Sequence, residues 1–535
     1  MIRSVSIQNF RLYEKFEVEL NEGCTILVGD NESGKSTLLE AISLGLTKRL
    51  NGRLLESELN PHLFSRACST EYLSGIRAGK NPLPPSIVVE LYFKDEPPLA
   101  FLRGTNNSKK LDSAGVRLEA AFDDAYKEEY ESFIRDRAVV TAIPTEYYRV
   151  VWSGFSGNPI TARSLPILTS LIDASTIRLQ SGTDYYLQGI INDTLSTKDK
   201  VELAIAYRSL KQDFFGRGSI KSINEKLRDD KGAVTTKELT IGFDVSQRNG
   251  WESGVVPHLD DIPFQYAGKG EQSRLKVMLA LRRHAPKSSV ILIEEPENHL
   301  SFSSMAQLID QIEEACEDKQ VVISTHSAYV LNKIGLEKLI LLSEQKQIAL
   351  RGLPPDTYGF FKKLPGYETL RMILAKKTIL VEGPSDELIV QKEYRNQHGK
   401  LPISDGIDVI SVGTSFKRFL EIAHRLGNRV VVVTDNDGDY ERRVEGKYSG
   451  YADKANITVC ADRDDSLPTL EPQIAACNDL ATLNAVFGTA YESADEIVRY
   501  MTDNKTECAV RLFDSVRTDI ASPDYIKRAV QAINA

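Results

Sequence analysis

The sequence predicts an α/β protein in which an N-terminal α/β domain with a helical insertion is followed by a second, Rossmann-like α/β domain. Three observations lead to this class. A glycine-rich phosphate-binding motif lies between an apolar run and a helical pattern at 29–36. Apolar runs at 290–295 and 320–327 have the composition of buried parallel strands. A second set of such runs follows at 378–383, 407–413 and 429–437.

The remaining elements follow from local patterning. Strands are expected at 2–8, 16–20, 24–29, 86–93 and 147–152, and a helix from about Lys35. The pattern becomes helical over about 160–235, strands return near 238–245, and helices are expected at 274–284 and over 476–535. The predicted domains are 1–155 with 238–370 for the ATPase, 156–237 for the helical insertion, and 371–535 for the second α/β domain.

Composition restricts the classes of protein to consider. A chain of 535 residues has room for two or three domains. The six cysteines include no C-x-x-C pair, which favours a reducing compartment and argues against a disulfide framework or a zinc site. No segment reaches the ~20 apolar residues of a membrane helix, and the N-terminus lacks a signal-peptide pattern. We therefore expect a cytoplasmic protein without a membrane partner.

The net charge of -9 does not by itself favour a nucleic-acid partner. Affinity for DNA depends on cations that neutralise phosphates, so any basic surface must be local.

The segment GDNESGKS, from Gly29 to Ser36, matches the P-loop pattern G-x-x-x-x-G-K-[ST]. Its backbone amides and the following helix N-terminus would face the phosphates of a nucleotide. Lys35 would reach the β- and γ-phosphates, and Ser36 would ligate Mg2+. The expected nucleotide-binding residues here are Gly29, Asn31, Gly34, Lys35, Ser36 and Thr37.

Two further segments have the pattern of an ATPase site. In ILIEEPENHL (291–300), Glu294 would hold Mg2+ and Glu295 would polarise the attacking water. In ISTHS (323–327), His326 could reach the γ-phosphate. The alternatives are a solvated strand end for the glutamates and a hydrogen-bonded core residue for the histidine.

The order P-loop, glycine-rich turn, EEPENHL and STHS resembles the ABC-type ATPase heads of the SMC and repair-ATPase superfamily. The resemblance implies ATP as cofactor, a dimer-facing loop at Asn298 and His299, and a signature loop in AGKGEQSRLK (267–276). Gly268 stands where that family has a phosphate-contacting serine, and Lys269 replaces the next glycine. These departures imply slow ATP hydrolysis, or a phosphate contact made by Lys269 instead.

Carboxylates follow two of the later apolar runs. Glu382 ends one run and Asp386 lies in the turn after it, whereas Asp435 and Asp437 follow VVVVT. Carboxyl ends of parallel strands share one edge of a sheet, so these acids can converge. Clustered ionised carboxylates need a compensating cation, and oxygen ligands suit Mg2+ or Mn2+.

These segments, LVEGPSDE and VVVVTDNDGD, resemble the Toprim domain of topoisomerases, primases and OLD nucleases, and following an ABC-type head they resemble the OLD variant. The resemblance implies metal and acid–base roles for Glu382, Asp435 and Asp437. It implies Asp386 as a further metal ligand. It also matches a later acid to Glu471 in TLEPQ and a phosphate-neutralising lysine to Lys505. Solvated surface is the alternative for Glu471 and Lys505.

These features together predict an ATP-binding, divalent-metal-dependent DNA endonuclease, of the kind that serves bacterial anti-phage defence in the OLD family. The alternative is a DNA-bound ABC-type ATPase clamp whose Toprim domain is a catalytically silent binding module. A primase or topoisomerase is disfavoured, because no zinc-ribbon cysteines and no strand-passage tyrosine segment are recognisable. The expected partners are DNA, a second copy in a homodimer or higher homo-oligomer formed through the insertion, and a helicase or retron component encoded nearby.

Overall fold

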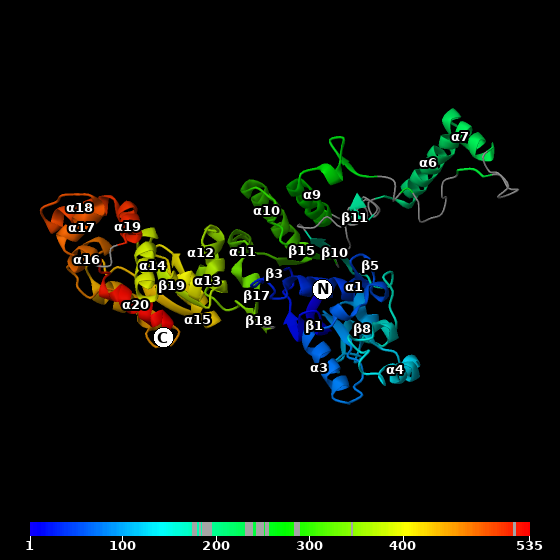
Figure 1. Cartoon of the computed structure of the whole chain (residues 1–535), viewed down its shortest axis with the longest axis horizontal. Coiled ribbons are helices and arrows are strands. Elements are labelled where there is room, and N and C mark those ends of the chain that lie inside the picture. Colours follow the sequence, from blue (N-terminus) through cyan, green and yellow to red (C-terminus); the bar gives the residue numbers. More distant parts are fainter. Residues whose placement is uncertain are drawn as a thin grey trace. The chain divides into compact units, whose positions relative to one another are not determined.

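The computed structural model describes residues 1–173, 179–180, 183–184, 195–229, 239–241, 251, 256–282, 289–343, 346–516 and 520–535. The chain forms two compact units, which are coloured along the sequence in Figure 1. The first contains Met1–Thr25 and Gly34–Thr325, and the second contains Ile26–Ser33 and His326–Ala535. The division falls at 325/326, whereas the sequence placed the domain boundary near 370.

The first unit contains a sheet built almost wholly from the N-terminal 155 residues. The order is β2 (Tyr13–Glu19), β1 (Ile2–Phe10), β6 (Ile87–Phe93), β8 (Ser113–Phe122) and β7 (Arg103–Gly104), and β9 (Tyr148–Gly154) also pairs with β8. Four of these strands were expected from the sequence. β8 was missed because SAGVRLEAAF contains small residues where a clear strand pattern would have large apolar ones.

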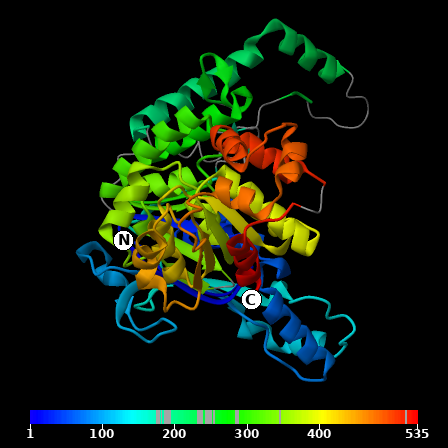
Figure 2. The same ribbon diagram turned by 90° about the vertical axis from the view of Figure 1, so that its left-hand side faces the viewer.

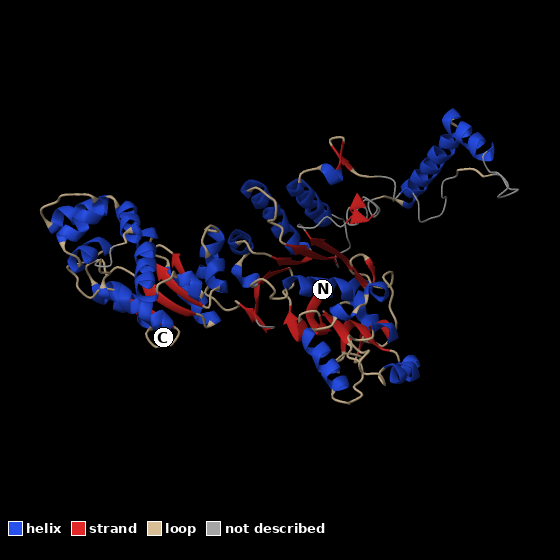
Figure 3. Ribbon diagram, in the orientation of Figure 1, coloured by secondary structure: helices blue, strands red, loops and turns tan. Residues whose placement is uncertain are grey.

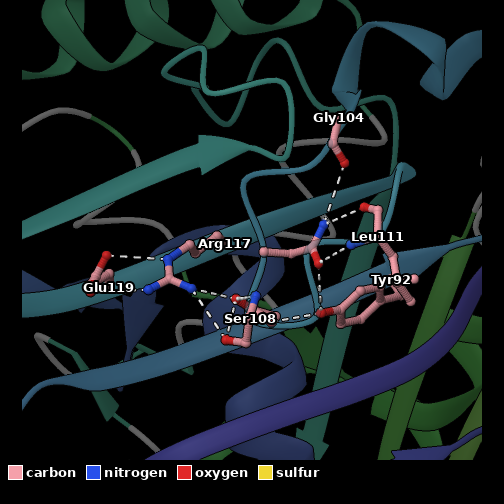
Figure 4. A network of polar contacts seen from close by, with 8 residues as sticks. Tyr92, Gly104, Ser108, Leu111, Arg117 and Glu119 are labelled. Carbon is pink, nitrogen blue, oxygen red and sulfur yellow. Dashed lines mark hydrogen bonds and ion pairs between the residues drawn. The ribbon is translucent and has the colours of Figure 1, made fainter.

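A buried polar network fixes the loop between β7 and β8 on this sheet (Figure 4). Glu90 is fully buried, and its Oε1 accepts a hydrogen bond from the Ser108 backbone amide at 2.8 Å. The same oxygen forms an ion pair with Arg117. The Tyr92 hydroxyl donates to the other Glu90 oxygen at 2.8 Å. The buried charge is therefore paired and fully hydrogen-bonded, as stability requires.

The parallel part of the first unit comprises β10 (Leu168–Asp173), β15 (Ser289–Glu294) and β16 (Gln320–Ser324). Helix α1 (Lys35–Thr47) contacts both this sheet and the antiparallel one. The indole of Trp152 donates to the carbonyl of Gly45 at 3.0 Å, where the lack of a side chain permits close packing. Helices α9 (Lys269–Arg282) and α10 (Phe302–Asp318) contact each other in the same unit.

The predicted helical insertion is partly wrong. β10 lies inside the range 156–237 and pairs in parallel with β15, so it belongs to the ATPase sheet. Its apolar run LTSLID is short, and periodicity alone does not separate a buried strand from a helix at that length. Helices do follow at α6 (Thr197–Gly216) and α7 (Gly218–Asp229). The strands expected near 238–245 lie mostly outside the described residues.

Shorter elements complete the first unit. They are β4 (Arg49–Leu50), β5 (Arg53–Leu54), α2 (Leu55–Glu58), α3 (Arg66–Arg77), α4 (Lys127–Phe133), β11 (Leu179–Gln180), β12 (Thr183–Asp184), β13 (His258–Leu259) and β14 (Ile262–Pro263).

The second unit begins with the end of β3 (Cys24–Val28), which pairs in parallel with β17 (Leu339–Ser343). β17 in turn pairs with β18 (Lys346–Ala349). Helices α11 (Ala328–Ile334), α12 (Pro355–Lys363) and α13 (Thr369–Leu374) lead into the Toprim-like domain. The side chain of Asn332, which is fully buried in α11, donates to the Tyr367 carbonyl at 2.9 Å.

The C-terminal domain has a four-stranded parallel sheet in the order β20 (Ile407–Ser411), β19 (Lys377–Val381), β21 (Arg429–Val433) and β22 (Ile457–Cys460). Three of its strands were expected, and the fold class predicted from the sequence is confirmed. The sheet and its covering helices are distinguished by colour in Figure 3. These helices are α14 (Pro384–His398), α15 (Phe416–Leu426), α16 (Leu470–Cys477), α17 (Leu480–Phe487), α18 (Ala494–Asp503), α19 (Lys505–Asp514) and α20 (Asp524–Asn534).

Among the described helices, none combines the length and apolar composition needed to cross a membrane.

Candidate functional site

The acids of the C-terminal domain lie where its two central strands end. Glu382 directly follows β19, and Asp435 comes two residues after β21, the neighbouring parallel strand. The Thr434 hydroxyl donates to Glu382 Oε1 at 2.7 Å, and the Asp435 backbone amide donates to the same oxygen at 3.2 Å. The sheet therefore brings the first and second acidic segments together, as the sequence predicted.

Asp386 and Asp437 are placed by the turns that follow the two strands. Asp386 lies in the first turn of α14, where its Oδ2 accepts from the Gly383 backbone amide at 3.0 Å. Asp437 has a left-handed backbone with φ 52°, and Gly438 continues it with φ 77°. The Asp437 carboxylate lies 4.0 Å from Arg443 Nε.

Burial and neighbouring negative charges disfavour the ionised forms of Asp435 and Asp386. The pKa of Asp435 is raised to about 8, first by burial and then by the negative charges of Asp386, Glu382, Glu471 and Asp437 in that order. Burial, followed by the charge of Glu382, raises the pKa of Asp386 to about 6. Ionising every one of these groups without a cation is therefore unfavourable.

Glu471 and Lys505 are not simply solvated surface residues. The side chain of Glu471 is 6% exposed, and its Oε1 lies 3.2 Å from Lys505 Nζ. Thr469 donates to the other carboxylate oxygen at 2.9 Å. Lys505 is about half exposed at the start of α19, so its ammonium group remains accessible beside the acidic cluster.

The donor set suits a hard divalent cation, although the side chains do not yet surround one. No three His, Cys, Asp or Glu side chains in the described ranges are placed so that they could hold an ion as they stand. Glu382, Asp386 and Glu471 are instead hydrogen-bonded to the protein. Asp435 Oδ1 is the exception, since it is buried without a hydrogen-bond partner. An unpartnered oxygen of this kind, with other carboxylates near it, is a suitable ligand for Mg2+ or Mn2+. The neighbouring side chains would have to reorient to complete the site.

Asn436, between the two aspartates, was missed by the sequence interpretation. It is fully buried, and its amide donates to the Asp462 and Asp464 carbonyls at 3.1 and 2.9 Å. Its side-chain oxygen accepts from the Gly438 amide at 2.8 Å. Asn436 thereby fastens the Asp435–Asp437 turn to the loop after β22. An asparagine before a glycine is ordinarily a turn residue, so the sequence carried no clear signal of this role.

In the first unit, the P-loop enters α1 in the expected way. Gly34 has φ 99°, and its carbonyl accepts from the Tyr13 hydroxyl at 3.1 Å. A β-carbon there would collide with that hydroxyl, so glycine is required for backbone and space alike. Lys35 is buried, and the Ser36 hydroxyl donates to Glu294. Ser36 and Glu294 are thus brought together, as expected of residues that share one Mg2+; Thr37 follows in the same helix.

Glu295 occupies a strained position after β15. Its φ is 46°, its amide donates to the Ser324 carbonyl at 2.9 Å, and its carboxylate accepts from Asn298 Nδ2 at 2.6 Å. Such backbone outliers occur often at functional sites. The signature segment also lies nearby in this unit, because a β-carbon on Gly270 would meet the His299 carbonyl.

The remaining predicted nucleotide residues belong to the second unit. Gly29 follows β3, and a β-carbon there would meet the Leu342 carbonyl of β17. Asn31 is exposed in the loop, and His326 is exposed directly after β16.

Comparison with known proteins defines the class of both domains. Residues 4–81 match a family described as "AAA domain", and residues 179–332 match a second AAA domain family. Residues 373–437 match "Overcoming lysogenization defect protein-like, TOPRIM domain". This composition is that of nuclease enzymes that carry an ATPase domain. The chain therefore carries ATPase-domain segments followed by a segment similar to the Toprim domain of OLD-like proteins.

Individual relatives and solved structures match the chain at low identity. Endonuclease GajA of Bacillus cereus (strain VD045) is 22% identical over 472 residues, covering 83% of this chain and 76% of GajA. Retron Vc95 probable ATPase of Vibrio cholerae serotype O1 biovar El Tor is 20% identical, and the match covers 75% of this chain and 87% of that protein. The solved C-terminal region of the Xanthomonas campestris pv. campestris OLD protein is 22% identical with a TM-score of 0.24, covering 30% of this chain and 94% of that one.

Proposed function

We propose that this chain is a DNA endonuclease that hydrolyses phosphodiester bonds at its Toprim site with Mg2+ or Mn2+, under the control of ATP bound to the ATPase domain. The observation that carries the proposal is that Glu382 and Asp435 meet where the paired strands β19 and β21 end, with the Asp435 amide donating to the Glu382 carboxylate. Similarity to the endonuclease GajA and to a retron ATPase supports a role in defence against phage.

The proposed roles follow from the position of each group. Glu382, Asp386, Asp435, Asp437 and Glu471 would hold the cations, which supply the positive charge that phosphodiester hydrolysis requires. Lys505, whose ammonium lies beside Glu471, would swing to a phosphate oxygen and balance the charge that develops there. Glu382, fixed by Thr434 and by the Asp435 amide, sets the geometry of the edge.

At the ATPase domain, Lys35 and the P-loop backbone would bind the phosphates, and Ser36 and Glu294 would hold Mg2+. Glu295 would polarise water once Asn298 releases its carboxylate, and His326 would contact the γ-phosphate. The chain would act as a homodimer or higher homo-oligomer through α6 and α7, because none of their described side chains is buried within the chain.

A second function remains open because the described acids form no ready ligand cage. In that case the chain is a DNA-binding ATPase clamp whose Toprim domain binds without cutting.

The test is cleavage of supercoiled plasmid with Mg2+, Mn2+ or EDTA. Wild type should nick DNA only with a divalent cation, and Glu382→Ala and Asp435→Ala should each lower the rate by at least about a hundredfold, since metal ligands are lost. Asp453→Asn is the matched control, because it removes an exposed carboxylate of the same domain that is outside the two acidic segments. A wild type that binds DNA and ATP but never cuts would favour the clamp.

A further inference from the structure

Tyr525 in the C-terminal helix α20 has a buried hydroxyl that the proposed mechanism does not use. The residue is 1% exposed, and its hydroxyl has no hydrogen-bond partner in the described structure. Buried tyrosine hydroxyls usually find a partner, because leaving a donor unpaired away from water is unfavourable. An unpaired phenol in a well-packed core therefore needs an explanation.

Helix α20 places this phenol at the acid cluster. The helix packs against β19, β21 and β22. It is drawn as the red ribbon that leads to the label C in Figure 2. The ring of Tyr525 belongs to the same apolar core as Val433, the last residue of β21, and Leu470, which precedes Glu471. Burial raises the pKa of the phenol well above its ordinary value, and the negative charge of Asp435 is the next largest cause. The phenol is therefore neutral at physiological pH and is a permanent hydrogen-bond donor.

Among the described carboxylates of the cluster, Asp435 Oδ1 is the one buried oxygen that also lacks a hydrogen-bond partner. It is an acceptor, and Tyr525 offers a donor, so the two orphaned atoms are complementary. Glu382, Asp386 and Glu471 already receive hydrogen bonds from other groups. Once Asp435 is ionised and turned toward a cation, the phenol of Tyr525 is a nearby donor that has no other partner.

We propose that Tyr525 is a positioning residue, which donates a hydrogen bond to the Asp435 carboxylate and holds it in the orientation that binds a divalent cation. The inference rests on the proposed function and extends it to a residue outside both acidic segments. Groups that orient metal ligands commonly affect metal affinity about 10- to 100-fold. The C-terminal helix would then be a part of the metal site, and not only a cover for the sheet.

Tyr525→Phe tests this idea because it removes the hydroxyl and keeps the ring. Thermal unfolding of the full chain without nucleotide is followed in EDTA and during Mn2+ titration. In EDTA the variant should be at least as stable as wild type, since a buried unpaired donor has been removed. The Mn2+ concentration at half-maximal stabilisation should rise about tenfold.

Tyr394→Phe is the matched control from the same domain. Tyr394 is equally buried, at 1% exposed, but its hydroxyl donates to Asp405 at 2.6 Å. This variant should lose stability in EDTA and keep the wild-type Mn2+ midpoint. The proposal is wrong if Tyr525→Phe keeps that midpoint within about twofold, or if it loses as much stability in EDTA as Tyr394→Phe. A wild type that binds no Mn2+ would overturn the proposed function itself, and the role of Tyr525 with it.

Discussion

At the scale of single residues, burial and mutual repulsion make ionisation of the acidic cluster unfavourable, and a bound divalent cation would relieve this repulsion. Asp435 and Asp386 lie among other carboxylates, and burial is the largest cause of their raised pKa values. Asn436 holds the turn that carries Asp435 in place. Its side-chain amide donates to two carbonyls of the loop after β22, and its side-chain oxygen accepts from the Gly438 amide within the turn. Repulsion is therefore relieved by protonation or by a cation, and not by opening of the loop.

This arrangement makes the metal-free protein sensitive to pH. The pKa of Asp386 is about 6 and that of Asp435 about 8, both above the ordinary value of 3.8. The folded state therefore binds more protons than the unfolded state, and stability falls as the pH rises from about 4 through about 8. We expect the melting temperature in EDTA to fall over this range, and excess Mg2+ to restore it most at the alkaline end.

The matched variants for this measurement are Asp435→Asn, which should flatten the decline, and Asp453→Asn, which should keep it. If the wild-type melting temperature in EDTA rises between pH 6 and pH 8, the clustered acids are not mutually destabilising.

At the scale of elements, helix α1 is the part of the ATPase site that is most tightly constrained. It contacts both sheets of the first unit, and its N-terminus begins at a glycine that no other residue could replace without strain. Lys35 is the first residue of this helix. The helix dipole would attract a nucleotide phosphate to the same end of the helix.

Lys35→Ala should weaken ATP binding by at least about tenfold, because a phosphate-contacting cation is lost. Equilibrium binding of labelled ATP measures the effect. Lys198→Ala in α6, where the lysine side chain is 85% exposed, is the control and should bind like wild type. Unchanged affinity in Lys35→Ala would contradict a P-loop at this position.

Elements also show what could be predicted from the sequence. Long apolar runs such as those of β15, β19 and β21 identified the parallel strands, and Glu294, Glu382 and Asp435 lie at or just after the ends of these strands, as predicted. β10 and β8 were missed, because one is short and the other contains small residues. Asn436 and Tyr525 could not be found, since their importance depends on atoms from distant segments.

At the scale of the whole molecule, two chemically independent reactions are proposed for one chain. Hydrolysis of a phosphodiester requires water and a cation, so ATP can influence it only by favouring one conformation over another. The altered signature segment, with Gly268 and Lys269, favours slow turnover of ATP. We therefore expect ATP to act as a switch on DNA access and not as the energy source for cleavage.

Under this account, Lys35→Ala keeps metal-dependent cleavage and loses its response to ATP. Glu295→Gln should bind ATP without hydrolysing it and remain at the ATP-bound level of activity. The measurement is the cleavage rate against ATP concentration in excess Mg2+, so that chelation by the nucleotide is not mistaken for regulation. A folded Lys35→Ala protein that cannot cut at all would show that ATP is obligatory.

The central claim is that the Toprim carboxylates form the divalent-cation site, and electron paramagnetic resonance of Mn2+ tests it most directly. Nucleotide-free wild type and Asp453→Asn should both remove the signal of free Mn2+ during titration. With the double variant Glu382→Ala and Asp435→Ala, the signal of free Mn2+ should persist, because the two acids at the ends of β19 and β21 are removed and the ion is not bound. Equal Mn2+ binding by the double variant and the wild type would contradict the account.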